Sequence, residues 1–335
     1  MKALRVGVLG CADIAQRRML PAMSASSDVE VTAVASRDAG KAREMARRFG
    51  AAPVHGYAAL LDRPDVDAVY VPLPAALHAR WVEQALKAGK HVLAEKPLAT
   101  NHADTERLLT LAAAQGRALV ENVMFVHHPQ HAKVAGLVRD GSIGDLWSFQ
   151  AAFTVPRRPA DDIRYRAELG GGALWDTGVY PARAALHFLG DELKVVGAAL
   201  AHVRWTETDV GGAVLLRTPD GVSAQLTFGL DHAYQSRYEL VGSKGRIVLE
   251  HAFTPPAGHA PHIRVERQGK PDTLVLSPED QVRLAVAAFV RAVAKATPPD
   301  PVSLRAAELL GEARTHAEQR PASARVPTHP EPDGE

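Results

Sequence analysis

The chain has 335 residues, of which 46% are hydrophobic and 23% are charged, and its formal net charge at pH 7 is +1. This length exceeds the size at which one hydrophobic core usually stops growing, so we expect two domains, and the near-neutral charge gives no reason to expect a nucleic-acid partner. One cysteine, Cys11, excludes an intrachain disulfide; an apolar signal core and a run of about 18 apolar residues are both absent. We therefore expect a cytoplasmic protein that does not span a membrane.

The first segment has the pattern of a nucleotide-binding βα unit. An apolar run over residues 4–9 leads into a turn, and a helix-length segment continues to about residue 26. The turn reads Gly10, Cys11, Ala12, Asp13, Ile14. A strand, a tight glycine turn and a helix form the pyrophosphate site of dinucleotide-binding units. Alanine replaces the second and third glycines of the G-x-G-x-x-G pattern, so the motif alone favours a nucleotide site no more than an ordinary turn.

A second strand, over residues 29–35, follows at βαβ spacing and ends in Ser36 and Arg37. In NAD-binding units an acidic residue near this point binds the adenosine ribose. A hydroxyl and a guanidinium in its place favour a 2′-phosphate, and therefore NADP, because the arginine fork matches phosphate oxygens. The alternative is that Ser36 and Asp38 only cap the following helix, expected at 39–49.

The alternation of strands and helices continues to about residue 122. We expect strands at 54–57, 67–72, 90–94 and 118–120, and helices at 39–49, 76–88 and about 101–115. Repeated βα units imply a parallel sheet covered by helices on both faces, with ligands at the carboxyl ends of its strands. That rule gathers on one edge the turn after the first strand, Ser36, Arg37, Pro72, Leu73, Glu95, Lys96, Glu121 and Asn122.

Glu95, Lys96 and Pro97 directly follow the apolar strand expected at 90–94. Two charges at the end of a buried strand need partners, which indicates a working site. A lysine that is partly desolvated beside a bound cofactor gives up its proton more readily, and this suits donation to a carbonyl oxygen as hydride reaches the carbon. Glu95 would pair with Lys96 or orient it. The alternative is a solvated surface lysine.

After residue 122 the pattern changes to long strands with hairpin turns. The clearest turns are Thr218-Pro-Asp-Gly221 and Gly242-Ser-Lys-Gly245. These predict a mostly antiparallel sheet, interrupted by one helix over about 174–188 and completed by helices near 278–296 and 303–319. We therefore expect a Rossmann domain at 1–122, a substrate-binding and oligomerisation domain of α+β type at 123–320, and a disordered tail at 321–335.

A glycine-rich segment from Gly170 leads to Asp176 and Tyr180. If the helix has begun by residue 174, the spacing of four places a carboxylate and a phenol on one face, where they can orient a sugar and move a proton. The alternative is a helix-terminal aspartate and a core aromatic. The loop before this segment carries four arginines that face either phosphates or solvent: Arg157, Arg158, Arg164 and Arg166.

Three histidines, His127, His128 and His131, suggest a metal site by their clustering. We expect no metal, because no carboxylate lies at helical spacing, Pro129 interrupts the local geometry, and a nicotinamide reduction with a lysine acid needs none. Neutral histidines that line a substrate cleft, or satisfied core histidines, remain as the two alternatives.

Three motifs carry a family resemblance: Gly10-x-Ala-Asp-Ile-Ala15, Ala94-Glu-Lys-Pro-Leu98 and Gly170-Gly-Gly-x-x-x-Asp176-x-Gly-x-Tyr180. In order and spacing they resemble the glucose-fructose oxidoreductase/inositol dehydrogenase/rhizopine catabolism (Gfo/Idh/MocA) family over about residues 4–315. The resemblance implies an α/β fold, with a doubly wound Rossmann sheet joined to an open antiparallel sheet, and a catalytic lysine. Many members have histidine where this chain has Tyr180.

That tyrosine, together with Val71-Pro-Leu-Pro74 and Asp162-Ile-Arg-Tyr165, is similar to the sugar-nucleotide 3-ketoreductases of deoxysugar and antibiotic biosynthesis. The resemblance implies reduction of the C-3 carbonyl of a dTDP-linked 3,4-diketo-2,6-dideoxyhexose by NADPH. Lys96 would donate the proton and Tyr180 would be its partner. Dimers or tetramers built through the open sheet are common in the family, so a homo-oligomer is expected.

The expected cofactor site comprises the turn residues 10–14 with Ser36, Arg37, Tyr57, Pro72, Leu73, His78, Glu95, Lys96, Asn122, Arg164 and Asp176. The expected substrate contacts are His127, His128, Tyr165, Asp176 and Tyr180. Two other functions stay open: an NADP-dependent dehydrogenase or aldose oxidoreductase that acts on a free sugar, cyclitol or diol, and a non-catalytic regulator that senses NADP.

Overall fold

The computed structural model describes residues 2–319, so the tail expected at 321–335 lies outside the described residues. The described chain forms two compact units. Unit 1 contains residues 2–133, 255–260 and 276–307, and unit 2 contains 134–254, 261–275 and 308–319. The domain boundaries expected after residues 122 and 320 stay a prediction. Within residues 2–319, no helix has both the length and the apolar character needed to cross a membrane.

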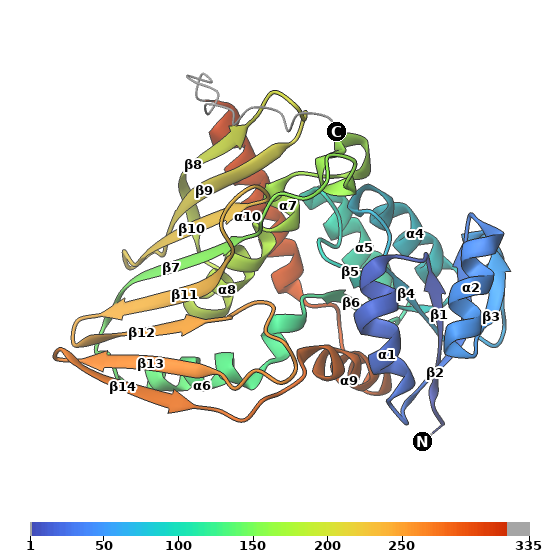
Figure 1. Cartoon of the computed structure of the whole chain (residues 1–335), viewed down its shortest axis with the longest axis horizontal. Helices are drawn as coiled ribbons and strands as arrows, with labels where there is room; N and C mark the ends of the chain where they lie inside the picture. The colour runs from blue at the N-terminus through green and yellow to red at the C-terminus, as the bar shows by residue number, and fades with distance from the viewer. Residues whose placement is uncertain (1, 320–335) are drawn as a thin grey trace. The chain divides into compact units, whose positions relative to one another are not determined.

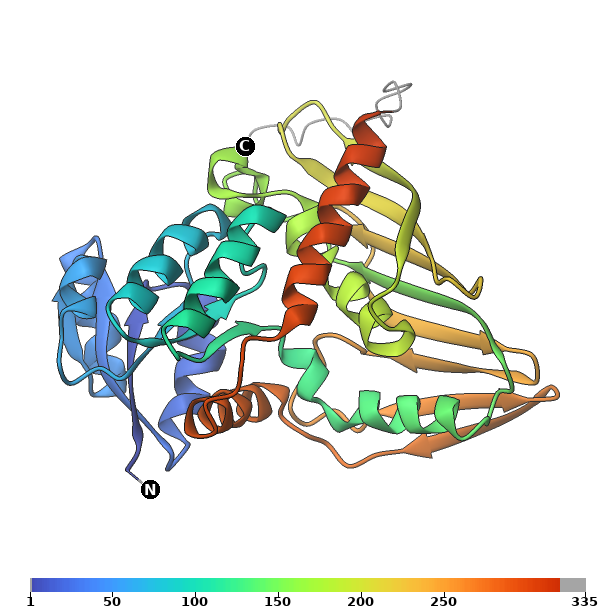
Figure 2. The same cartoon turned by 180° about the vertical axis from the view of Figure 1, so that it is seen from behind.

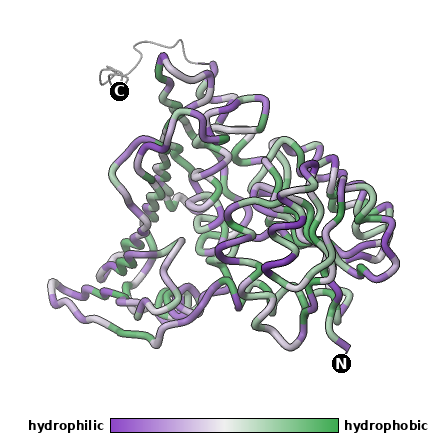
Figure 3. The backbone as a smooth tube through the Cα atoms, turned by 45° about the vertical axis from the view of Figure 1, so that its right-hand side comes forward, coloured by the Kyte–Doolittle hydropathy of each residue, from purple (hydrophilic) through white to green (hydrophobic). Residues whose placement is uncertain are grey.

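Unit 1 is built on a six-stranded parallel sheet in the order β3-β2-β1-β4-β5-β6 (Figure 1). Its strands are β1 (Leu4–Leu9), β2 (Val29–Ser36), β3 (Ala52–His55), β4 (Ala68–Val71), β5 (His91–Glu95) and β6 (Leu119–Asn122). Hydrophobic residues mark the central strands (Figure 3), as expected for a sheet that is covered on both faces. The strand order is that of a doubly wound Rossmann sheet, so the predicted fold class is confirmed.

Helices cover both faces of this sheet. They are η1 (Ala15–Met19), α1 (Leu20–Ser24), α2 (Ala39–Phe49), α3 (Tyr57–Leu61), α4 (Ala75–Lys87), α5 (His102–Ala114) and α9 (Gln281–Ala294). A short helical turn, η2 (Met124–His127), follows β6 in the chain. One core contains side chains of α3, α4 and α5, and the other contains side chains of α1, α2 and α9. Helix α9 joins unit 1 although it lies about 160 residues after β6 in sequence, because its buried Val282, Val286 and Phe289 complete the second core.

Several helix ends follow the sequence signals. Helix α2 begins after Asp38, whose carboxylate accepts from two backbone N–H groups, and ends at Gly50 with φ 67°. Helix α5 begins after Asn101, whose side chain accepts from the Asp104 N–H at 2.8 Å. The strand expected over 54–57 is wrong at its end: Gly56, at φ 87°, breaks the strand and Tyr57 starts helix α3.

Unit 2 contains an eight-stranded sheet in the order β14-β13-β12-β11-β7-β10-β9-β8. Its strands are β7 (Leu146–Thr154), β8 (Lys194–His202), β9 (Asp209–Arg217), β10 (Ser223–Gly229), β11 (Gln235–Gly242), β12 (Gly245–Glu250), β13 (His262–Arg267) and β14 (Lys270–Val275). All neighbours pair antiparallel except β7 and β10, so the predicted sheet type is confirmed. Both predicted hairpins are present, β9 to β10 and β11 to β12.

One face of this sheet packs against α7 (Ala173–Asp176) and α8 (Val179–Leu189), and the view in Figure 2 shows α8 lying over the strands. Two short turns, η3 (Ile163–Tyr165) and η4 (Ala167–Leu169), precede them, and α6 (Pro129–Arg139) and α10 (Pro301–Glu318) contain residues of both units. The single helix expected over 174–188 is wrong. The N–H groups of Thr177 and Gly178 both donate to the Ala173 carbonyl, at 2.9 and 2.8 Å, and this ends α7 before α8 begins.

Candidate functional site

The first turn of unit 1 requires glycine. Gly10 ends β1 at φ 117°, and a Cβ atom there would lie 2.8 Å from a methyl carbon of Leu73. Its N–H donates to the Ala35 carbonyl at 2.8 Å, which ties the turn to β2. The turns after β1 and β4 are therefore packed together at the carboxyl edge of the sheet, where doubly wound folds bind nucleotides.

Four predicted cofactor residues form one cluster beside this turn: Cys11, Ser36, Arg37 and Tyr57. Burial raises the pKa of the Cys11 thiol, against a hydrogen bond with Ser36 that lowers it. Burial also raises the pKa of Tyr57, against the lowering charge of Arg37 and a hydrogen bond with that guanidinium. The Tyr57 ring contacts Trp81 edge-on at 4.9 Å, so the hydroxyl is held from behind by the core.

Asp38, a carboxylate close to this cluster in the sequence, is the N-cap of helix α2. Asp38 accepts from the N–H groups of Gly40 and Lys41, at 2.7 and 3.1 Å, and these bonds lower the pKa of its carboxyl group. An aspartate that caps a helix in this way is turned toward the backbone rather than toward a ribose 2′-hydroxyl. Asp38 is therefore the helix cap, and the exposed Arg37 lies beside Tyr57, while the binding of a 2′-phosphate by Ser36 and Arg37 stays a prediction.

The turn after β5 carries the partly exposed Lys96 and rests on a buried carboxylate. Glu95 is 8% exposed, and its Oε1 accepts from the Tyr70 hydroxyl and from the Asn122 amide, both at 2.7 Å. Burial raises the pKa of Glu95, while those two bonds and the charge of Lys96 lower it in part. Three adjacent strands, β4, β5 and β6, therefore hold one charged group directly beneath the lysine turn.

His78, on α4, links that turn to the turn after β4. Its Nδ1 lies 2.7 Å from the Pro97 carbonyl oxygen, and its Nε2 lies 2.6 Å from the Leu73 carbonyl oxygen. The ring is 1% exposed. Its nitrogens thus face backbone carbonyl oxygens of two neighbouring turns and not solvent.

In unit 2, the structure brings Arg164 and Asp176 together. The Arg164 Nε donates to Asp176 at 2.9 Å, and its Nη1 donates to Asp162 at 3.0 Å. Burial acts to lower the pKa of Arg164, but the charges of Asp176 and Asp162 outweigh it and raise that pKa. Asp176 and Tyr180 lie on successive helices, and the Tyr180 ring packs on Phe153 with centroids 4.5 Å apart.

The remaining predicted substrate residues are tied into their own units. In unit 2 the Tyr165 hydroxyl donates to the Leu230 carbonyl at 3.0 Å and accepts from the Arg158 N–H at 3.1 Å. In unit 1 His128 and His131 are 1% and 0% exposed, with ring centroids 6.4 Å apart, and burial lowers the pKa of His128. His127 precedes them at the end of η2 and is less buried.

Two residues that support the site were missed from the sequence. Tyr70 lies in the apolar run of β4, and a phenol inside a fully buried strand is a signal that its hydroxyl needs a partner. Asp209, 3% exposed at the start of β9, accepts from the Leu174 N–H at 2.7 Å and so caps the helix that carries Asp176. No local pattern predicts that cap, because Asp209 lies 35 residues after its donor.

Comparison with known proteins adds two family matches. Residues 4–123 match a family model described as an oxidoreductase family with an NAD-binding Rossmann fold. Residues 131–248 match the model of the GFO/IDH/MocA C-terminal domain. The two matches together span most of the chain.

Two curated relatives match the chain over most of its length. The dTDP-3,4-didehydro-2,6-dideoxy-alpha-D-glucose 3-reductase of Actinomadura kijaniata is 53% identical over 317 residues, which cover 94% of this chain and 96% of that protein. The protein of the same name from Streptomyces violaceoruber is 57% identical over 297 residues, covering 88% and 87%.

Among solved structures, a 3-ketoreductase from Actinomadura kijaniata in complex with NADP and TDP-benzene superposes with a TM-score of 0.92 at 53% identity, over 94% of this chain and 98% of that one. The same ketoreductase has been solved with one lysine replaced by alanine or glutamate, and with one tyrosine replaced by phenylalanine. The two replaced positions are as far apart along that chain as Lys96 and Tyr180 are along this one.

Proposed function

The chain belongs to the GFO/IDH/MocA oxidoreductase family, and on that basis we propose that it is an NADPH-dependent 3-ketoreductase of deoxysugar biosynthesis. It reduces the C-3 carbonyl of a dTDP-linked 3,4-diketo-2,6-dideoxyhexose. The observation that carries this assignment is the likeness to reductases of that name at 53% and 57% identity over at least 87% of either chain.

The residues of unit 1 fit NADP. The Gly10 turn lies at the carboxyl end of β1, the edge at which doubly wound sheets bind a pyrophosphate, and Asp38, the carboxylate that would repel a 2′-phosphate, is engaged as a helix cap. Arg37 and Ser36 bind the 2′-phosphate in our proposal, with Tyr57 orienting the Arg37 guanidinium. When bound, NADPH supplies the hydride. The other proposed cofactor residues are Cys11 to Ile14, Pro72, Leu73, His78, Glu95, Lys96 and Asn122 of unit 1, and Arg164 and Asp176 of unit 2.

Lys96 supplies the proton in our proposal, and Tyr180 is the second catalytic group. The coulombic attraction between Glu95 and Lys96 supports the first role, because the carboxylate favours a charged ammonium on its neighbour. The aromatic packing of Tyr180 on Phe153 supports the second, because it fixes the ring of a residue that is only partly buried. The variants solved for the ketoreductase from Actinomadura kijaniata, at a lysine and a tyrosine of equal separation, give independent support.

The substrate is a nucleotide-linked sugar. We propose that His127, His128, Tyr165, Asp176 and Tyr180 contact it. The side chains of Tyr165 and Asp176 are held in place, because the first is hydrogen-bonded to the Leu230 carbonyl and the second to Arg164.

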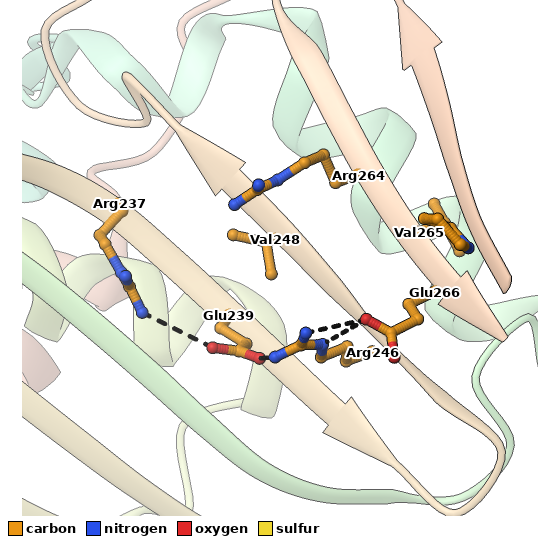
Figure 4. Close-up of a pocket in the computed structure, with 8 residues that line it drawn as sticks. Arg237, Glu239, Arg246, Val248, Arg264, Val265 and Glu266 are labelled. Carbon is orange, nitrogen blue, oxygen red and sulfur yellow. Dashed lines mark hydrogen bonds and ion pairs between the residues drawn. The ribbon is translucent and has the colours of Figure 1, made fainter. Parts of the chain in front are cut away.

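We also propose a homo-oligomer, a dimer or tetramer, that forms through the open face of the eight-stranded sheet in the cytoplasm. That face carries a ladder of ion pairs across β11, β12 and β13, which Figure 4 shows. Glu239 bonds to Arg246 at 3.2 Å, and Arg246 bonds to Glu266 at 2.8 Å. Both arginine and glutamate charges are satisfied within the sheet, so this surface can approach a second copy without leaving buried unpaired charges.

The direct test measures NADPH oxidation with a dTDP-linked 3,4-diketo-2,6-dideoxyhexose, generated in place, for the wild type and Lys96→Met. We expect turnover by the wild type and a loss of about 100-fold or more in kcat for the variant, which keeps the length of the side chain without an acidic proton. Equal rates would remove Lys96 from the mechanism. Free sugars, cyclitols and diols form the comparison series, and faster turnover of any of them would favour the dehydrogenase alternative. NADPH binding with no turnover of any carbonyl substrate would favour the regulator.

A further inference from the structure

His78 faces two hydrogen-bond acceptors, but a neutral imidazole ring has only one N–H group to donate. The atoms opposite its two nitrogens, at 2.7 and 2.6 Å, are the carbonyl oxygens of Pro97 and Leu73, which can only accept hydrogen bonds. A neutral imidazole carries one N–H, so it can satisfy one of them while a ring lone pair faces the other. Only the imidazolium, with two N–H groups, bonds to both.

These two carbonyls belong to functional turns of the same sheet edge. Leu73 packs against the Gly10 turn, and Pro97 directly follows Lys96. His78 itself is fixed, because α4 packs on β4 and β5 and the ring is 1% exposed. A bond made or lost at either ring nitrogen therefore changes how firmly one functional turn is held relative to the other.

The electrostatic surroundings oppose the second proton. Burial lowers the pKa of His78, the two carbonyl bonds raise it, and the charged group that acts on the ring from the packed turns, the Lys96 ammonium, lowers it. The net direction is downward. Near neutral pH the ring therefore holds one N–H, and one of its two backbone bonds lacks a donor.

We propose that His78 is a positioning residue that ties the Lys96 turn to the Leu73 turn, with both ties closed only when both ring nitrogens carry a proton. This inference rests on the proposed function in one respect, the role of Lys96 as proton donor. As pH falls, the ring gains its second N–H and both turns are held. As pH rises through the lowered pKa of the folded protein, one tie opens.

The protonation state is tested without any turnover. We would label the full chain with ¹⁵N-histidine, assign the His78 ring from a His78→Gln sample, and follow both ring nitrogens between about pH 5 and 8. The expected result is two N–H groups at the acidic end, one at the basic end, and a midpoint below the ordinary pKa of histidine. A ring with one N–H throughout, in a protein that stays folded, would overturn the proposal.

The positioning role is tested by kinetics with a matched control. His78→Phe removes both donors and is expected to lower kcat by roughly 10- to 100-fold, with a smaller change in KM, because misplacement of a catalytic group costs about that much. His78→Gln keeps an amide donor at every pH and is expected to lower kcat by about 10-fold. It serves as the second variant if His78→Phe does not fold. The control is His91→Asn, since His91 bonds to the Ala118 backbone at 2.9 Å from the opposite end of β5.

We expect His91→Asn to lower stability while kcat stays unchanged. Unchanged kcat in both folded His78 variants would overturn the positioning role. If the wild type itself reduces no dTDP-ketosugar, the proposed function fails, while the ring titration still decides whether His78 closes both ties.

Discussion

Tyr70 and Glu95 share a hydrogen bond of 2.7 Å inside the parallel sheet, from the phenol of β4 to the carboxylate that ends β5. The same carboxylate oxygen accepts from Asn122 on β6. Hydrogen bonds to a buried charge are about twice as strong as neutral ones and are costly to remove. The charge of Glu95 therefore depends on two neutral donors from the flanking strands.

Tyr70→Phe removes one of these donors without changing the shape of the core. We expect the free energy of unfolding at pH 8 to fall by about 1.5–3 kcal/mol, the usual size of a hydrogen bond to a charged group. Burial already raises the pKa of Glu95, so the folded protein binds its proton more readily and stability falls as pH rises from the unfolded pKa through the folded one. The variant raises that pKa further, so its deficit should be larger at pH 8 than at pH 5 in urea titrations.

The control for this variant is Tyr234→Phe in unit 2, an exposed residue whose hydroxyl bonds to that of Thr254 at 3.1 Å. We expect a change within about 0.5 kcal/mol. A Tyr70→Phe deficit that is as small as the control, or that is independent of pH, would contradict the role assigned to the hydroxyl.

Arg37→Ala should weaken NADPH binding and leave NADH binding unchanged, because only NADPH carries the 2′-phosphate. Loss of a charge-assisted hydrogen bond of about 1.5–3 kcal/mol corresponds to a 10- to 100-fold higher Kd. Fluorescence titration of both cofactors measures this. Arg48→Ala, which removes an arginine stacked on Phe49 at the far end of α2, should change neither affinity. Equal weakening for NADH and NADPH would refute the phosphate role.

Arg164→Lys should destabilise unit 2, because one ammonium cannot serve Asp162 and Asp176 with the fixed geometry of a guanidinium. We expect a loss of about 1–2 kcal/mol in the free energy of unfolding and a lower kcat/KM, since Asp176 loses its orientation. Arg166→Lys is the matched control: its pair with Glu168 lies on the exposed surface and should contribute at most about 1 kcal/mol. Similar losses in the two variants would show that the double pairing of Arg164 has no special role.

Asp209→Ala leaves the Leu174 N–H without its acceptor and should cost about 1–3 kcal/mol. Asp209→Asn keeps a carbonyl oxygen and should cost less. Burial raises the pKa of Asp209, so the wild type loses stability as pH rises through that pKa, whereas the asparagine variant does not. The difference between Asp209→Asn and the wild type should therefore shift in favour of the variant with rising pH in denaturant titrations. A constant difference would contradict the assignment.

The sequence determined those features that depend on neighbouring residues. The helix predicted at 39–49 is α2 with the same bounds, and Asp38 caps it as one interpretation of the sequence expected. The predicted parallel and antiparallel sheets are both present, because strand periodicity and turn residues act over a few positions. Local signals failed where one residue changed the backbone path, at Gly56 before α3 and at Gly178 between α7 and α8.

Only the tertiary structure decided which residues that are distant in the sequence form hydrogen bonds with one another. The bond from Tyr70 to Glu95 requires β4 and β5 to be neighbours in a fixed register, and the cap of α7 by Asp209 requires β9 to reach that helix. His78 was predicted to line the cofactor site, but its two carbonyl partners come from two separate turns. Such contacts follow from strand order and register over the whole sheet, and no short stretch of sequence contains that information.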